Sequence, residues 1–188
     1  MQLQTKRCVL RPWRESDAPA LYACARDARV GPAAGWPVHT DVENSRQIIR
    51  EVLSGEEVYA VVPREGGADR PAGSVGLLFG AAGNVPLAEG EAELGYWIGV
   101  PFWGQGLIPE AARALLRHGF ADLGLRAIWC SCYEGNEKSR RVQEKCGFRF
   151  HHIDREQTCP LTGAPRAAYV SRITRGQWEQ LCESGRFD

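Results

Sequence analysis

Two glycines one residue apart, Gly104 and Gly106, separate a strand-like run from a helix-like run in the stretch FWGQGLIPEA, residues 102–111. A turn of this kind is expected to leave backbone N–H groups without partners, here those from Trp103 to Ile108, and the dipole of a helix that starts beside them attracts an anion such as pyrophosphate. Pro109 suits the first turn of that helix, where a missing N–H costs nothing. The same glycines also fit a plain strand-to-helix turn that needs positive φ. The stretch alone leaves both interpretations open.

Two familiar nucleotide-binding patterns fit this turn poorly. The dinucleotide pattern G-x-G-x-x-G needs a third small residue at position 109, where the ring of Pro109 obstructs close packing, although Glu134 imitates the ribose-binding acid. The triphosphate pattern G-x-x-x-x-G-K-[ST] fails because no Lys-Ser or Lys-Thr follows the loop. An NAD-binding oxidoreductase and a Walker-type nucleotide site are therefore disfavoured.

Apolar periodicity predicts the elements that hold this loop in place. Strands are expected over the ranges 6–13, 58–62, 72–80, 91–100, 127–133, 148–154 and 166–174. Helices are expected after the capping residues Asp17, Asp41, Asn136 and Thr174, and from Ile108 up to Gly124. The proline- and glycine-rich run 29–41 is expected to be loop. The order of these elements favours one mixed α/β domain over residues 1–188.

Composition and charge argue against several classes of protein. The chain has 188 residues, 44% of them hydrophobic, with 23 basic and 23 acidic side chains. With no net charge and no long basic run, sequence-independent nucleic-acid binding is not expected as its main task. The chain shows no secretion signal and no apolar run of membrane-spanning length, so a cytoplasmic protein without a membrane partner is expected.

The cysteines and histidines match no disulfide or metal pattern. There are seven cysteines and no C-x-x-C pair, which does not resemble a disulfide framework. Cys130 and Cys132 alternate in a strand and are expected to share one face, whereas the adjacent His151 and His152 are expected to point to opposite faces. Neither arrangement has the ligand spacing of a zinc site, so no metal is expected.

A second block makes the assignment of the glycine loop more specific. Residues 136–148 match the pattern N-x-x-S-x-x-V-x-E-K-x-G-F at every fixed place, and they follow the loop in the right order and spacing. Together the two blocks resemble the GCN5-related N-acetyltransferases, in the branch of ribosomal-protein alanine N-acetyltransferases. The opening LRPWRESDAPALY, residues 10–22, also resembles that branch, so the likeness covers nearly the whole chain.

The loop itself matches the family's cofactor motif [Q/R]-x-x-G-x-[G/A], with the tryptophan that is usual for the branch at Trp103. Ile108 and Pro109 depart from the commoner Ala-Thr, whereas Glu110 and Ala111 agree with the branch. The resemblance implies a single α/β (α+β) domain with a mixed, mostly antiparallel sheet of six to seven strands, flanked by about four helices. It also implies acetyl-CoA as donor and an amine as acceptor, either a protein N-terminus or a small molecule.

The resemblance places the pantetheine arm of acetyl-CoA along the strand 91–100 and its pyrophosphate on the glycine loop. An unpaired strand edge suits an amide-bearing ligand because the ligand satisfies the free backbone groups. The cofactor contacts that it implies are Trp97, Ile98, Val100, Trp103, Gly104, Gln105, Gly106, Leu107, Ile108, Asn136 and Ser139.

Three residues are candidates for the chemistry. Glu93 lies on the same strand face as Trp97 and is the candidate general base, with a water relay or an ordinary strand glutamate as alternatives. The Trp97 N–H is the candidate donor to the thioester oxygen. Most of the family protonate the CoA thiolate with a tyrosine on the helix 136–146, which this chain lacks; the resemblance to the branch implies the Ser139 hydroxyl in that role, and Ser139 also suits an ordinary first-turn serine. Asn136 caps this helix, binds pantetheine, or does both.

The acceptor side is the least specific part of the sequence. The loop 31–40 and the turn 155–165 are expected to flank its mouth, lined by Trp36, His39 and Tyr133, each of which also suits a packing role. The motifs fix the cofactor and not the acceptor, so an antibiotic or polyamine acceptor, another acyl donor, and a CoA-binding sensor without turnover stay open. A monomer and a homodimer are equally compatible with the sequence.

Overall fold

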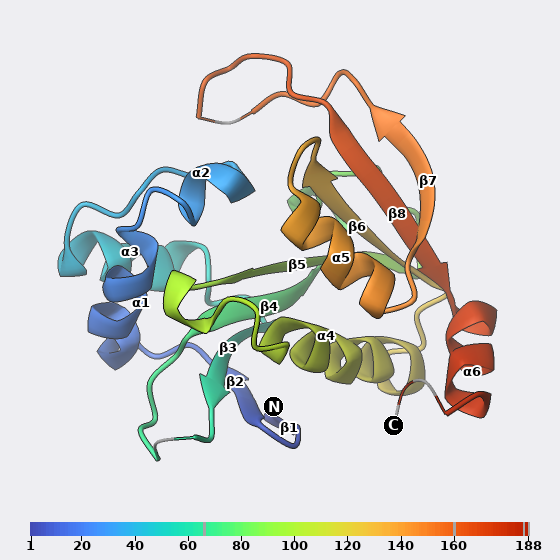
Figure 1. Ribbon diagram of the computed structural model, residues 1–188, viewed down its shortest axis with the longest axis horizontal. Helices are drawn as coiled ribbons and strands as arrows, with labels where there is room; N and C mark the ends of the chain where they lie inside the picture. Colours follow the sequence, from blue (N-terminus) through green and yellow to red (C-terminus); the bar gives the residue numbers. More distant parts are fainter. Residues whose placement is uncertain (66, 160, 186, 188) are drawn as a thin grey trace.

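A single sheet runs through the molecule in the strand order β1-β2-β3-β4-β5-β6-β8-β7 (Figure 1). The computed structural model describes residues 1–65, 67–159, 161–185 and 187. The strands are β1 (Leu3–Gln4), β2 (Cys8–Pro12), β3 (Val58–Pro63), β4 (Gly73–Leu78), β5 (Glu91–Ile98), β6 (Ala127–Tyr133), β7 (Arg149–Asp154) and β8 (Ala168–Thr174). The α-helices are α1 (Ala18–Ala25), α2 (Gly31–Ala34), α3 (Val42–Glu51), α4 (Leu107–Arg117), α5 (Glu137–Lys145) and α6 (Arg175–Glu183).

Neighbouring strands are antiparallel everywhere except between β5 and β6. These two strands pair in parallel over three residues only, from Glu91 opposite Ala127 to Glu93 opposite Trp129. The parallel pair is joined through α4, because parallel neighbours need a crossover connection. Beyond Glu93 the strands diverge, so the second half of β5 has no strand partner on its β6 side.

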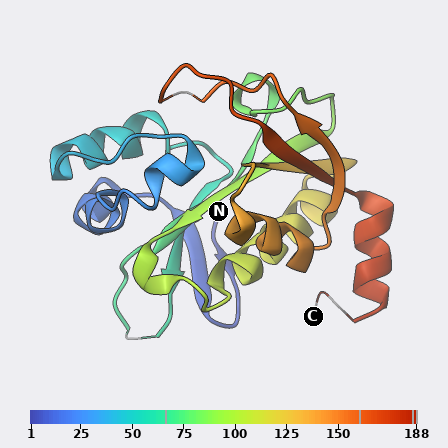
Figure 2. The same cartoon turned by 45° about the horizontal axis from the view of Figure 1, so that its top comes forward.

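The two faces of the sheet carry separate hydrophobic clusters. Helix α4 packs its apolar side on one face, with Ala111, Leu115 and Leu116 fully buried. Helices α1 and α3 cover the other face, where Leu21 and Ile49 are buried. Figure 2 shows α1, α2 and α3 gathered on the opposite side of β5 from α4 and α5. Both faces of β5 are therefore covered, and its side chains alternate between the two clusters.

Most of the predicted elements are present, and the class of fold is as expected. The sheet has eight strands rather than six or seven, because the short β1 also pairs with β2. The caps Asp41, Asn136 and Thr174 accept from backbone N–H groups of the helices that follow them. Asp17 precedes α1 without capping it through its side chain.

Two local expectations were wrong. The run 29–41 is not all loop, because α2 forms a single turn there, with Pro32 in its first turn and Gly35 ending it at φ 88°. The rings of His151 and His152 do not point apart, since their centroids are 5.0 Å from each other. A register shift between β7 and β8 falls at these residues, and a bulge of this kind breaks the alternation of side chains. With α2 included, the described residues form six α-helices, where about four were expected.

Candidate active site

One cavity of about 1250 Å³ occupies the divergence of β5 and β6 and extends to the face covered by α1 and α3. Its lining includes every residue that the sequence assigned to the site except Val100 and Gln105. The cavity thus joins the glycine loop and the second half of β5, which are close in the sequence, to the distant start of α5.

The glycine loop presents backbone donors to this cavity. Gly104 and Gly106 both have left-handed backbones, with φ of 76° and 74°, which accounts for glycine at each position. The N–H groups from Gly104 to Ile108 donate no hydrogen bond to any residue that the structure describes. The N–H of Trp103 was expected to be free as well, but it donates to Val100 O at 3.1 Å. The free donors meet the N-terminus of α4, where an anion is favoured.

Arg7 of the β1–β2 turn holds the other side of this loop. Its guanidinium donates to the carbonyl oxygens of Gln105 at 2.7 Å and Gly106 at 3.2 Å. It also pairs with the Glu110 carboxylate of α4 at 2.6 Å. Because these carbonyls are bound to Arg7, the loop keeps its N–H groups directed elsewhere. Local sequence patterns do not predict this contact, since Arg7 lies about a hundred positions from the loop that it binds.

Two further cations lie next to the loop. The Lys138 ammonium is 3.4 Å from the centroid of the Trp103 ring, and the Arg29 guanidinium is 6.0 Å from it. Both side chains belong to the lining of the cavity. Positive charge beside free N–H groups strengthens the attraction for a phosphate-bearing ligand.

The backbone of β5 turns alternate residues toward its two neighbours. Just before β5, the carbonyl of Gly90 accepts from the Arg126 N–H on the β6 side at 2.8 Å. The backbone N–H and C=O groups of even-numbered residues therefore point towards β6. Where the two strands have diverged, the backbone groups of Tyr96 and Ile98 point into the gap. The Ile98 carbonyl already accepts from Trp103 Nε1 at 2.9 Å, which leaves the two N–H groups and the Tyr96 carbonyl for a ligand.

This alternation corrects the assignment of the Trp97 N–H. Trp97 is odd-numbered and is registered with Ser74 of β4, so its backbone faces β4 and not the gap. The N–H groups that point to the gap are instead those of Tyr96 and Ile98. The side chain of Trp97 lines the cavity, on the face that it shares with Glu93 as the sequence predicted.

Glu93 is buried within the cavity wall and does not face solvent. Its side chain is 1% exposed, and Ser131 of β6 donates its hydroxyl hydrogen to Glu93 Oε1 at 2.5 Å. The N–H of Asn84 donates to the other carboxylate oxygen. Ser131 also lines the cavity, so its hydroxyl stands between the buried carboxylate and the open space. Sequence reasoning missed Ser131 because nothing in the motif blocks points to it.

Ser139 is held by a tyrosine, although that tyrosine is not on α5. The Tyr96 hydroxyl lies 2.9 Å from Ser139 Oγ and 3.0 Å from the Ser139 carbonyl oxygen. Burial raises the pKa of the Tyr96 phenol well above its usual value, so this hydroxyl stays protonated and can donate. The alternation of ELGYWI predicts that the side chains of Tyr96 and Trp97 lie on opposite faces of β5, but not that Tyr96 reaches α5.

Asn136 has two partners in the structure. Its side-chain oxygen accepts from the Ser139 N–H at 3.2 Å, which caps α5, and its amide nitrogen donates to Ala33 O of α2 at 3.4 Å. Arg166, before β8, donates to Pro32 O at 3.1 Å. The short helix α2 is therefore tied across the mouth of the cavity to the C-terminal half of the chain.

The three residues predicted for the acceptor mouth all line the cavity. Trp36 meets the Trp97 ring edge-on at 5.7 Å between centroids. The Nδ1 of His39 is 2.8 Å from Ser45 Oγ, and because Ser45 donates its hydrogen to the Asp41 carbonyl, Nδ1 carries the histidine proton. Burial lowers the pKa of His39, which favours this neutral form.

Tyr133 closes the mouth from the β6 side. The Arg166 guanidinium lies over its ring, 4.0 Å from the centroid. A Cβ on Gly35 would come within 2.6 Å of the Tyr133 hydroxyl, so this phenol packs directly against the end of α2. The turn 155–165 supplies Gln157 to the cavity wall, and residue 160 of that turn lies outside the described residues.

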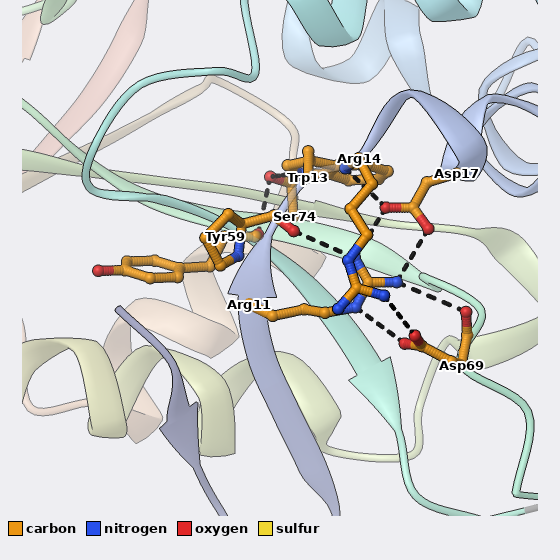
Figure 3. Close-up of polar contacts among 8 residues, drawn as sticks. Arg11, Trp13, Arg14, Asp17, Tyr59, Asp69 and Ser74 are labelled. Atoms are coloured by element: carbon orange, nitrogen blue, oxygen red, sulfur yellow. Dashed lines mark hydrogen bonds and ion pairs between the residues drawn. The ribbon is translucent and has the colours of Figure 1, made fainter.

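A polar network centred on the buried Arg11 guanidinium lies next to Trp13 (Figure 3). The Arg11 guanidinium donates to both oxygens of Asp17, at 2.7 and 2.8 Å, and to Asp69 at 2.8 Å. Next to it, Trp13 Nε1 donates to Ser74 Oγ at 3.1 Å. The Trp13 ring stacks on Trp97 with centroids 6.2 Å apart. These bonds fix the Trp13 indole, and the Trp97 ring in the cavity wall stacks against it.

Neither a cluster of metal ligands nor a membrane-spanning helix occurs among the described residues. No group of three or more His, Cys, Asp or Glu side chains gathers there as a metal site. None of the helices that the structure describes has the length and apolarity to cross a membrane.

A mixed sheet whose parallel strands diverge beside a loop of free N–H groups, with a buried carboxylate in the same cavity, is the fold and site of this chain. The chain belongs to the acetyltransferase (GNAT) domain family, whose model matches residues 7–149. Its fold and family together make it an N-acetyltransferase.

Individual relatives agree with this family. YdaF of Bacillus subtilis is 42% identical over 65 residues, which make up 35% of this chain and 36% of that protein. The N-acetyltransferase YoaA of the same organism is 29% identical over 161 residues, or 82% of this chain and 86% of that protein. The structure of Mycobacterium smegmatis RimJ in complex with CoA-disulfide shares the fold, with a TM-score of 0.74 at 22% identity, covering 99% of this chain and 95% of that one.

Proposed function

We propose that this protein transfers an acetyl group from acetyl-CoA to a primary amine, either a protein N-terminus or a small molecule, with both substrates bound at once. The observation that carries the proposal is the continuity of one cavity, which joins the free N–H groups of the glycine loop to the gap-facing backbone of β5 and to Glu93. A carrier with a pyrophosphate at one end and amides along its arm fits that order of groups.

The residues present fit acetyl-CoA. The N–H groups from Gly104 to Ile108 would bind its pyrophosphate, and a Cβ on Gly104 would meet no protein atom within 4 Å, so there is room for a ligand at that point. The backbone of Tyr96 and Ile98 would pair with its pantetheine amides. Bound there, acetyl-CoA supplies the activated acyl group. RimJ, which shares the fold, was solved with a CoA compound.

The side chains around the gap would manage the protons. An amine attacks only when neutral, and the buried Glu93 would receive its proton through Ser131, whose hydrogen is already directed at Glu93 Oε1. Ser131 would take the amine proton as it gives its own to Glu93. On the other side, Ser139 would donate its hydroxyl hydrogen to the departing sulfur and regain one from water as the products leave, while the Tyr96 hydroxyl, 2.9 Å away, stays protonated and holds Ser139 Oγ in place. The Tyr96 N–H, at the gap, would stabilise charge on the thioester oxygen.

Saturating acetyl-CoA is expected to raise the Tm of the protein, whereas NAD is not. A ligand at about 100 times its Kd that binds only the folded state adds about 2.7 kcal/mol of apparent stability, which is a rise of roughly 5–10 °C for a domain of this size. The measurement is a thermal melt with each ligand, followed by thiol release in the presence of primary amines. No stabilisation by acetyl-CoA would overturn the proposal.

The sensor hypothesis has lost its main support. It depended on the missing tyrosine of α5, and Tyr96 places a phenol hydroxyl at Ser139 from β5 instead. Stabilisation by acetyl-CoA without thiol release, across free amines and peptide N-termini, would revive it and contradict acetyl transfer.

Replacing Arg7 with alanine is expected to raise the KM for acetyl-CoA about fivefold and to leave kcat nearly unchanged. The two bonds from its guanidinium to loop carbonyls are charge-assisted, but the side chain is half exposed, so their loss costs about 1 kcal/mol. Arg64→Ala is the matched control, because Arg64 bonds Gln4 near the same turn and does not reach the loop. Equal KM values for the two variants would show that Arg7 does not organise the loop.

A further inference from the structure

Three glycines of the β4–β5 pair have a packing reason to lack a side chain. A Cβ on Gly73 would collide with the Trp97 carbonyl oxygen, and one on Gly99 would lie 2.6 Å from Cys24 Sγ. A Cβ on Gly76 would come within 3.1 Å of the Glu57 carbonyl oxygen. Gly73 and Gly99 are therefore closed to a larger residue by the protein itself, and at Gly76 the neighbouring backbone would have to move by a few tenths of an ångström.

Gly95, in the middle of β5, has no such reason. It does not adopt a left-handed backbone, and a Cβ placed on it would meet only Leu78 Cδ1, at an ordinary 3.6 Å. Glycine weakens a strand interior and often marks a bulge, a bend or the close approach of a ligand. The register with β4 runs unbroken through Gly95, so a bulge does not account for this glycine. Gly95 lines the cavity between Glu93 and Trp97, directly across from Gly76.

The cavity wall on this face of the sheet is apolar and aromatic. It is formed by side chains from α1, α3, β3 and the loop after α2, including Leu21, Trp36, Ile48, Leu53 and Val58. The basic side chains Arg29 and Lys138 of this cavity lie beside the glycine loop, where the phosphates of acetyl-CoA would neutralise them. Among the described residues, those that α1, α3 and β3 contribute to the lining include no carboxylate, so the additional positive charges of a polyamine or an aminoglycoside would find no partner on this face.

We propose that the acceptor carries one primary amine on an apolar group, and that this group lies against Gly95 with its nitrogen directed at Ser131 and Glu93. The assignment rests on the proposed acetyl transfer and names its substrate class. The bare backbone at Gly95 admits a flat or branched carbon group next to the amine, and the apolar wall buries it. A free arylalkylamine and a peptide that begins with an aromatic residue share this chemistry.

Gly95→Ala tests the proposal, with phenethylamine, a phenylalanyl-alanine amide and spermidine as probes. For the wild-type protein, kcat/KM is expected to be highest for one of the two aromatic amines and lowest for spermidine. In the variant, the added methyl group is expected to lower kcat/KM for the aromatic amines by about tenfold or more, the range that one carbon makes in a fitted pocket. The aromatic probe whose kcat/KM falls in the variant shows whether the acceptor is a free amine or a peptide N-terminus.

Two further measurements separate a lost pocket from a damaged fold. The Tm of Gly95→Ala is expected to rise by about 1–4 °C, because alanine suits a strand better than glycine does. The Kd of acetyl-CoA is expected to stay within about twofold, since the methyl group faces the acceptor side. Gly176→Ala is the matched control, at a glycine of ordinary φ on α6 with nothing within 4 Å of its Cβ, and it should leave all kinetic constants unchanged.

The outcomes distinguish this inference from the function on which it rests. Faster turnover of spermidine, or unchanged kcat/KM in Gly95→Ala, would overturn the substrate class and leave acetyl transfer standing. Weaker acetyl-CoA binding with an unchanged KM for the amine would place the donor, and not the acceptor, against Gly95. Absence of thiol release with every amine in the wild-type protein would instead overturn the acetyl transfer itself.

Discussion

Replacing Glu93 with glutamine is expected to lower kcat for acetyl transfer by about 10²–10⁴-fold, the usual contribution of a positioned general base. The substitution keeps the shape of the side chain. Glutamine can place its oxygen toward the Asn84 N–H and its NH₂ toward Ser131, whose hydroxyl then accepts instead of donating. The fold has no reason to change, but the proton from the amine loses its destination. Steady-state thiol release under saturating acetyl-CoA measures the effect.

Glu91→Gln provides the matched control on the same strand and the same face. The Glu91 carboxylate also accepts a side-chain hydrogen bond, from Trp129 Nε1 at 2.8 Å, but it does not line the cavity. We expect its kcat to stay within about threefold of the wild-type value, and both variants to keep the wild-type Kd for acetyl-CoA. If Glu93→Gln falls within the same threefold range, Glu93 serves only to hold the Asn84 loop and Ser131 in place.

The local parts of this site could be predicted from the sequence. The spacing of Gly104 and Gly106, with Pro109 in the following turn, was enough to predict a loop of free N–H groups at a helix start. The cap at Asn136 and the apolar stripe of α4 depend on neighbours within a few residues, so local patterns fix them. The one-turn helix α2 was missed because four residues are too few to show a helical period.

The contacts between distant elements could not be predicted in this way. Alternation in ELGYWI gives two faces and two edges of β5, but not which strand lies at which edge. The Trp97 N–H was misassigned for that reason, and the register with Ser74 decides it. The bonds of Tyr96 to Ser139 and of Arg7 to the loop likewise join segments dozens of residues apart. Such pairs follow from the sheet order, which local patterns do not contain.

Replacing Arg11 with methionine is expected to lower the free energy of unfolding by about 3–5 kcal/mol, the cost of removing one partner of a buried ion pair. Arg11 and Asp17 are only 3% and 5% exposed, and the guanidinium binds both carboxylate oxygens of Asp17 (Figure 3). Methionine fills similar volume but leaves the Asp17 charge buried with only the Arg14 N–H as a partner. Urea unfolding measures the loss, and the corresponding fall in Tm is roughly 10 °C.

Arg14→Ala supplies the contrast within the same network. The Arg14 and Asp69 side chains are 56% and 57% exposed, so the pair that they form is expected to contribute no more than about 1 kcal/mol. The double variant Arg11→Met with Asp17→Leu should regain most of the stability, since it removes the stranded charge together with its partner. Because Trp13 lies beside this network and stacks on Trp97, the single Arg11 variant should also lose activity at temperatures where it is still folded. Equal stability of Arg11→Met and Arg14→Ala would contradict this account, because burial would then make no difference to the two arginines that share Asp69.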